Sequence, residues 1–277
     1  MSIILGIDVG GSTTKIVGLN GKKCIDMLQV KAADQITSMY GAIGNFLRRL
    51  GKSPSDVSDI YLTGVGATFV DEHIYGIRTH KVSEFDAIGH GAIYQTALKE
   101  ALVVSMGTGT AFVKVTADGV AHLGGSGVGG GTIIGLASHM LGKNDIDAIL
   151  AIAENGTTKN IDLAVSDIIC KDIKTLPADL TASNFGKLKS TASDSDIALG
   201  IINLVFETVG MLSVFALKND SIKDVVLTGT LATFPQAKPI FSKFNMMTEL
   251  NFIVPDNAIY TTALGAVTLG GANSLLF

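Results

Sequence analysis

The sequence has no tryptophan, only 2 cysteines and 5 prolines in 277 residues, and only 17% charged residues. Cys24 and Cys170 lie far apart without a CxxC pair, which excludes a disulfide scaffold, a zinc knuckle and an iron–sulfur cradle. The formal net charge is −4 and no stretch interleaves basic residues with aromatics, so we expect no nucleic-acid partner. Hydrophobic residues make up 47% of the chain, which is enough for a large core and excludes disorder. Both cysteines are expected to be small buried hydrophobes.

Two apolar stretches resemble targeting or membrane segments. Residues 1–9 include Asp8 and lack a basic region and a small-residue cleavage site, so we expect a strand there and a cytoplasmic protein. Residues 257–277 carry no charge over a length of roughly one membrane span. Threonines and glycines dilute this stretch and no Lys or Arg flanks it, which favours a packed helix and no membrane partner.

The chain contains two similar halves. A strand over residues 3–9 ends in glycines, and two more strands joined at Asn20-Gly21 predict a hairpin. Residues 102–106, 111–117 and 120–123 repeat this plan around Asp118-Gly119. We interpret the repeat as a duplicated half, and the alternative is chance similarity of two β-meanders.

The other apolar runs alternate between helix and strand patterns, which is typical of α/β layers. Helices are predicted over residues 36–50, 133–141, 144–153 and 196–217, and strands over residues 60–62, 224–227 and 252–254. The helix over residues 196–217 is apolar nearly all round, so we expect it to be buried on more than one side. A dimer seam is one way to bury it.

Three glycine-rich loops are candidates for phosphate binding. The first runs from Gly6 to Lys15, where Gly10 and Gly11 allow close approach and the hydroxyls and lysine supply donors and charge. Asp8 suits a magnesium ion held through water. The residues of this loop expected at the nucleotide are Asp8, Gly10, Gly11, Ser12, Thr13, Thr14 and Lys15. An ordinary glycine-rich turn is the alternative.

The second loop is Gly107-Thr108-Gly109-Thr110, and the third is the block from Gly124 to Thr132. Interior glycines are costly in a folded backbone, so their density favours close approach to a ligand over a linker. A helix that starts near Thr132 would present its first N–H groups to an anion.

Glu84 begins the segment Glu84-Phe85-Asp86-Ala87 behind Ser83, a possible helix cap. It could act as a catalytic carboxylate or simply favour the helix N-terminus. The five histidines show no metal-ligand spacing, and His122 is of interest because it precedes the Gly-rich block.

The loops from Gly6 to Lys15 and from Gly107 to Thr110 resemble the two phosphate loops of the actin-like ATPase superfamily, and Thr228-Gly229-Thr230 after a later strand resembles its adenosine loop. Four segments resemble type II pantothenate kinases: GIDVGGSTTK, EFDA, the stretch from Gly107 to Leu136, and DLTASNFGK from Asp179 to Lys187. Their order and spacing match over nearly the whole chain. The resemblance implies two ribonuclease-H-like lobes with ATP in the cleft between them, a first lobe over residues 1–82, a larger one over residues 83–277, and a homodimer held through the larger lobe.

The resemblance also implies transfer of the ATP γ-phosphate to the primary hydroxyl of pantothenate, which opens coenzyme A synthesis. Glu84 is then the general base, and Asp8 helps to hold Mg-ATP. The other nucleotide-binding residues implied are Ser12 to Lys15, Thr108, Gly130, Gly131, Thr132, Gly229 and Thr230. Glu84, Thr108 and His122 are the substrate-binding residues that we expect.

His122 departs from the family, which has an arginine at this position. A histidine cannot form the bidentate fork of a guanidinium. The alternatives are therefore a kinase of a related alcohol such as pantetheine, and a nucleotide-binding regulatory protein without transfer activity. A sugar kinase with a cysteine-rich zinc motif or a dehydratase activator with cluster cysteines would need cysteines that this sequence does not have.

Overall fold

The computed structural model describes residues 2–21, 23–32, 34–70, 73–169 and 180–271. The first five-stranded sheet has the order β3-β2-β1-β4-β5. Its strands are β1 (Ile3–Val9), β2 (Thr13–Asn20), β3 (Lys23–Lys31), β4 (Val57–Thr63) and β5 (Arg78–Lys81). The hairpin partners are antiparallel, whereas β4 pairs in parallel with both β1 and β5.

The second five-stranded sheet repeats this topology with the order β8-β7-β6-β11-β12. Its strands are β6 (Ala101–Met106), β7 (Thr110–Thr116), β8 (Gly119–Ser126), β11 (Asp224–Thr228) and β12 (Asn251–Ile253). Again β6, β7 and β8 are antiparallel, and β11 pairs in parallel with β6 and β12. Since the fourth and fifth strands match as well, the predicted duplication is confirmed.

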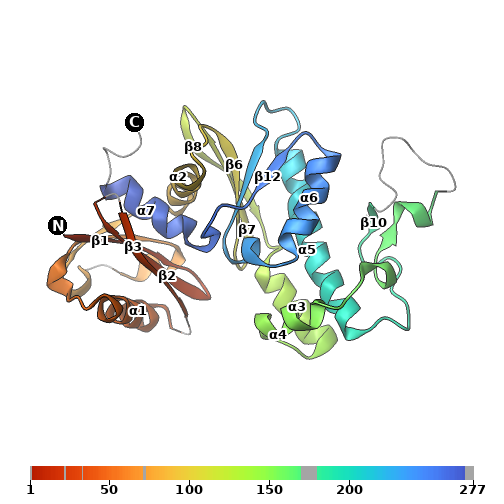
Figure 1. Cartoon of the computed structure of the whole chain (residues 1–277), viewed down its shortest axis with the longest axis horizontal. Helices are drawn as coiled ribbons and strands as arrows, with labels where there is room; N and C mark the ends of the chain where they lie inside the picture. The colour runs from red at the N-terminus through yellow and green to blue at the C-terminus, as the bar shows by residue number, and fades with distance from the viewer. Residues whose placement is uncertain (1, 22, 33, 71–72, 170–179, 272–277) are drawn as a thin grey trace.

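Seven α-helices surround the sheets in the described part of the chain (Figure 1). They are α1 (Gln35–Leu50), α2 (Glu84–Thr96), α3 (Gly130–Leu141), α4 (Ile146–Ala153), α5 (Asp194–Ala216), α6 (Ala237–Met247) and α7 (Thr261–Gly271). Helix α1 ends as its sequence predicts, because Gly51 adopts a left-handed φ of 63°. The sequence patterns missed α6, β5 and the two-stranded sheet of β9 (Leu163–Ala164) and β10 (Thr181–Ser183).

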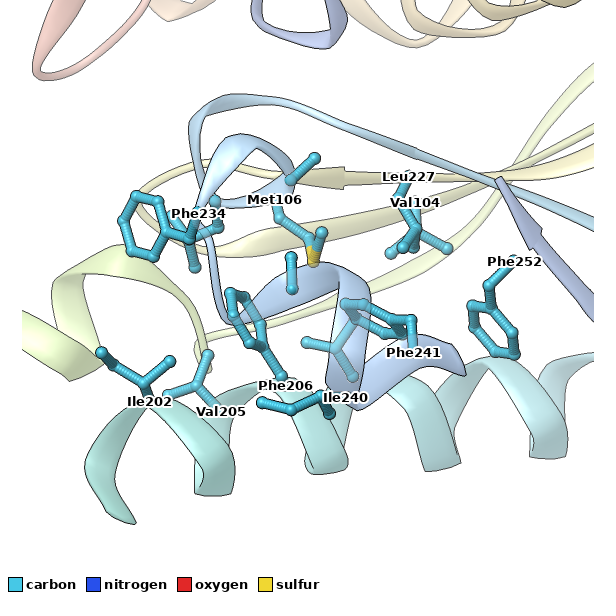
Figure 2. Close-up of a cluster of buried hydrophobic side chains, with 14 of the residues drawn as sticks. Val104, Met106, Ile202, Val205, Phe206, Leu227, Phe234, Ile240, Phe241 and Phe252 are labelled. Atoms are coloured by element: carbon cyan, nitrogen blue, oxygen red, sulfur yellow. The ribbon is translucent and has the colours of Figure 1, made fainter. Parts of the chain in front are cut away.

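The largest core lies between the second sheet and helices α5 and α6. Figure 2 shows side chains of β6 and β11, such as Val104 and Leu227, facing Phe206 of α5 and Phe241 of α6. Helix α5 is the one described helix that is long and apolar enough to cross a membrane, with a mean hydropathy of 1.9. Because 56% of its apolar window is buried in the molecule, the same pattern fits a core helix.

Helices α2 and α7 cross in direct backbone contact. A Cβ atom built on Gly265 would lie 1.7 Å from the Ala87 carbonyl oxygen, and one on Gly91 would lie 2.0 Å from that of Thr261. Helix α2 packs on β6, β7 and β8, whereas α7 packs on β1, β2 and β4. The C-terminal helix therefore lies on the first sheet, although the predicted boundary after residue 82 assigns it to the second lobe.

Three local expectations need correction. Strand β8 extends to Ser126, so the first part of the Gly-rich block is paired strand, and α3 begins at Gly130 instead of near Thr132. Cys24 is half-buried on β3 and packs against a core cluster from its edge, while Cys170 lies outside the described residues.

Candidate active site

The first two glycine-rich loops meet at the carboxyl ends of β1 and β6. Each is closed by a backbone hydrogen bond, from Gly10 N to Thr13 O at 3.0 Å and from Gly107 N to Gly109 O at 2.9 Å. The hydroxyl oxygens of Ser12 and Thr108 lie 3.3 Å apart and are exposed. The fold thus brings together two loops that are 96 residues apart in the sequence.

The Gly-rich block supports the second loop. Gly130 N donates to Gly107 O and Gly131 N donates to Thr108 O, each at 2.9 Å. A Cβ on Gly129 would lie 2.7 Å from Thr108 O, so a larger residue would push the loop away. Two of the first N–H groups of α3, the group expected to face an anion, are therefore bonded to the second loop. Thr132 closes the same turn, donating from its hydroxyl to Gly127 O at 3.1 Å.

Asp8 and Lys15 form a buried ion pair at the first loop. They are direct partners across β1 and β2, and Lys15 Nζ lies 3.4 Å from Asp8 Oδ2, with 11% and 10% of the two side chains exposed. Burial raises the pKa of Asp8 above its ordinary value, and the nearby ammonium of Lys15 opposes this shift. The lysine expected to contact phosphate is thus paired with the aspartate.

Thr13 and Thr14 differ in what they present to the loop. Thr13 is half-buried at the start of β2. Thr14 is fully buried and its register partner is Val9, so its side chain shares the core face that α1 covers. The expectation that Thr14 lines the phosphates is therefore wrong for its hydroxyl, which would have to leave the core to reach a nucleotide.

Asp8 fits a magnesium ion held through water. A Cβ on Gly64, which has a φ of 87°, would lie 2.6 Å from Asp8 Oδ1, so the glycine keeps space open beside that oxygen. No group of three or more His, Cys, Asp or Glu side chains in the described residues could enclose a metal. Mg²⁺ needs no such cage, because it keeps several waters and binds one or two carboxylates together with substrate phosphates.

Glu84 lies at the start of α2, near this pair. The hydroxyl of Ser83 accepts from Asp86 N at 3.4 Å and caps the helix, as the sequence suggested. Burial raises the pKa of Glu84, the negative charge of Asp8 raises it further, and Lys15 lowers it. The carboxylate therefore lies within electrostatic reach of both members of the ion pair.

His122 stacks on the residue that follows Glu84. The imidazole ring of His122 and the phenyl ring of Phe85 are nearly parallel, with centroids 3.8 Å apart and an interplanar angle of 9°. The residue that departs from the family pattern thus lies on β8 of the second sheet and stacks on the neighbour of the candidate base. Sequence reasoning did not include Phe85 in the site, although it directly follows Glu84.

Gly229 and Thr230 follow β11 at the same end of the second sheet. Gly229 has a φ of 85°, and a Cβ there would lie 2.5 Å from Met106 O. Its N–H donates to Ala258 O at 3.0 Å. The equivalent residue in the first sheet is Gly64, which the sequence analysis missed. The signal was present, because Thr63-Gly64 and Thr228-Gly229 end equivalent strands.

The segment DLTASNFGK does not belong to this site. Asp179 lies outside the described residues, while Thr181 and Asn184 both donate to Glu207 of α5 at 2.8 Å. Phe185 N donates to the carboxylate of Asp162 at 2.9 Å. Figure 1 shows β10 on the side of α5 remote from the first sheet. These contacts attach the segment to α5.

Solved structures share this fold. An activator of 2-hydroxyisocaproyl-CoA dehydratase from Clostridium difficile with bound ADPNP aligns with a TM-score of 0.70 and 18% identity, over 95% of this chain and 92% of its own. A ROK family protein from Streptococcus pneumoniae in complex with sucrose aligns with a TM-score of 0.59 and 13% identity, over 96% and 97%. The duplicated sheets and facing loops therefore define the two-lobed α/β fold of actin-like ATPases and sugar kinases.

Sequence comparison narrows this class to one family. The Fumble family model matches residues 68–242. A type II pantothenate kinase of Bacillus cereus strain AH820 is 30% identical over 83% of both chains. Another, from strain G9842, is 27% identical over 96% of this chain and 98% of its own. The chain belongs to the type II pantothenate kinase family.

Proposed function

We propose that this protein is an ATP-dependent pantothenate kinase that phosphorylates the primary hydroxyl of pantothenate, the first step of coenzyme A synthesis. The observation that carries the proposal is the position of Glu84. This carboxylate, with its raised pKa, lies near the Asp8–Lys15 pair at the end of the sheet where the two exposed loop hydroxyls of Ser12 and Thr108 meet.

The reaction needs positioning and charge neutralisation more than covalent chemistry. The acceptor oxygen attacks the γ-phosphorus, the bond from that phosphorus to the bridging oxygen of ADP breaks, and the hydroxyl proton passes to Glu84. A raised pKa makes this carboxylate a stronger base than an ordinary glutamate. Asp8 favours the protonated form of Glu84 and Lys15 opposes it, so the ion pair tunes the proton affinity of this base.

Nucleotide binding is assigned to the loops that the fold brings together. Ser12, Thr13 and Thr108 provide hydroxyls, and Gly10 and Gly11 let the backbone approach the phosphates. The start of α3 holds the second loop in place through the backbone N–H groups of Gly130 and Gly131. The Thr132 hydroxyl supports this contact by bonding to Gly127 O. Gly229 and Thr230 would contact the adenosine.

Magnesium would be held at Asp8 through water and would neutralise charge on the phosphates when bound. Asp8 Oδ1 is the oxygen available for this, because the ammonium of Lys15 lies against Oδ2. Gly64 preserves the space beside Oδ1.

The acceptor would lie along Glu84, Thr108 and the stacked rings of Phe85 and His122. The family has an arginine at the position of His122. An imidazole binds a carboxylate less strongly than a guanidinium does, so we expect weaker recognition of an acceptor carboxylate here. Pantetheine, which lacks the carboxylate, is the acceptor that tests this difference.

Assembly as a homodimer and a cytoplasmic location are part of the proposal. Helix α5 supports the dimer, because its apolar side chains Met211 and Phe215 remain 39% and 63% exposed. Sedimentation should give twice the mass of 28.8 kDa. A stable monomer would contradict the dimer and leave the reaction untouched.

The decisive experiment incubates the purified protein with Mg-ATP and, separately, pantothenate, pantetheine and a panel of sugars, with product mass and ADP release as readouts. We expect phosphopantothenate. Glu84→Gln should retain ADP binding and lower kcat by about 10²- to 10⁴-fold, the usual contribution of a general base. Nucleotide binding without transfer to any acceptor would favour the regulatory alternative, and an unchanged kcat would remove Glu84 from the role.

A further inference from the structure

The side chain of Gln95 joins the end of α2 to the turn that precedes α7. Its Nε2 donates to Asp256 O at 2.9 Å and lies 3.3 Å from Asn257 O. Its Oε1 accepts from the Thr261 hydroxyl at 2.5 Å. Both polar ends of the half-buried Gln95 amide therefore form hydrogen bonds to residues more than 160 positions later in the chain.

The turn that Gln95 holds contains a residue in the left-handed region. Asn257 has a φ of 58°, a conformation that asparagine adopts more readily than most non-glycine residues. The carbonyls of Asp256 and Asn257 are the two that Gln95 engages, so its amide stabilises this geometry. Thr261 begins α7 and lies at the helix crossing, where its carbonyl is 2.0 Å from a Cβ built on Gly91.

The same turn supports the loop after β11. The residue that follows Asn257 is Ala258, which is buried and accepts from Gly229 N at 3.0 Å. Gly229 in turn lies against the Met106 backbone with a φ of 85°. A continuous path of hydrogen bonds and adjacent residues therefore runs from Gln95 through Asn257 and Ala258 to Gly229.

Glu84 and Gln95 lie in the first and last turns of the same helix. Helix α2 thus carries the proposed base at one end and the clamp on the proposed nucleoside loop at the other. We propose that Gln95 is a positioning residue that sets the Gly229 loop for nucleotide binding. This inference rests on the proposed function only in assigning that loop to the nucleotide.

Gln95→Leu removes the polar groups with little change in volume. We expect the Kd for ADP, measured by calorimetry, and the KM for ATP to rise about five- to tenfold, the size of effect of losing a hydrogen bond. The kcat and the KM for pantothenate should stay within about twofold, because Glu84 lies at the other end of the helix.

Thr96→Val is the matched control. Thr96 is the next residue on α2, and its hydroxyl bonds to Ala92 O within the same helix at 2.7 Å. Its loss should leave ADP binding unchanged. A purely structural role for Gln95 predicts a lower Tm for Gln95→Leu with no selective change in nucleotide affinity, and that result would overturn the inference.

Thr261→Val supplies a second test if Gln95→Leu folds poorly. Because the Thr261 hydroxyl lies 2.5 Å from Gln95 Oε1 and 2.9 Å from Ala258 O, the two substitutions act on the same hydrogen bonds and should be non-additive in ADP binding. Additive effects, or no effect of Thr261→Val, would contradict the clamp. A wild-type protein that binds no nucleotide would instead overturn the proposed function, so the two failures are distinguishable.

Discussion

The hydroxyl oxygens of Ser12 and Thr108 lie 3.3 Å apart, which joins the first loop of one sheet to the first loop of the other. Each residue follows the first strand of its sheet, and the two sheets have the same strand order. The duplicated architecture therefore places equivalent loops face to face. The side chains at equivalent positions differ, however. Asp8 pairs with Thr63 in the first sheet, and Ser105 pairs with Thr228 in the second, so a serine takes the place of the aspartate.

Replacing these hydroxyls should weaken ATP binding. Ser12→Ala and Thr108→Val are each expected to raise the KM for ATP by about 10- to 150-fold, since a hydrogen bond to a charged group contributes roughly 1.5–3 kcal/mol. Steady-state kinetics with varied ATP measure the effect. Ser58→Ala is the control, because the Ser58 hydroxyl lies 3.4 Å from Ile3 O within the first sheet, away from both loops. An unchanged KM in Ser12→Ala would exclude a phosphate contact for that residue.

The difference in stability between Glu84→Gln and the wild-type protein should depend on pH in a defined direction. Burial and Asp8 raise the pKa of Glu84, so the folded protein favours the protonated form, and its stability decreases as pH rises through that pKa. The neutral glutamine does not have this penalty. We expect the variant to have the higher Tm at pH 7, with the difference shrinking as the pH falls through the titration of Glu84. A difference in Tm that does not change with pH would contradict the shift.

His122→Arg should change the preference between acceptors. A guanidinium can stack on Phe85 as the imidazole does and can also pair with a carboxylate in a bidentate manner. We expect the KM for pantothenate to fall about tenfold, in line with one charge-assisted contact, while that for pantetheine is unchanged. Equal changes for both acceptors would show that His122 does not meet the acceptor carboxylate.

The crossing of α2 and α7 should tolerate no side chain at Gly265. A Cβ there would lie 1.7 Å from the Ala87 carbonyl oxygen, so the helices must separate. Gly265→Ala is expected to destabilise the protein by about 2 kcal/mol or more, as overpacking does. Urea denaturation measures this change.

Gly41→Ala on the exposed face of α1 is the control for Gly265→Ala. A Cβ on Gly41 meets nothing within 4 Å, so the alanine should stabilise the helix by about 0.5–1 kcal/mol. Similar stabilities of the two alanine variants would contradict direct backbone contact between α2 and α7.

The amino-acid sequence by itself determined the local elements and the duplicated plan. Alternating apolar runs specified β1, β2, β6 and β7, and the spacing of apolar residues with Gly51 specified α1. These features depend on neighbouring residues along the chain. The short strand β5 and the helix α6 gave weaker signals, since their formation depends on pairing and packing with distant parts of the chain.

The tertiary structure decided which polar groups are available for chemistry. Sequence placed Lys15, Thr14, Gly130 and Gly131 in phosphate loops, yet the fold pairs Lys15 with Asp8, buries Thr14 and uses both glycine N–H groups to hold the second loop. The fold also places Gly64 beside Asp8. Hydrogen-bond partners are set by which distant backbone segments meet, and burial sets the cost of charge, so neither can be determined from residue order alone.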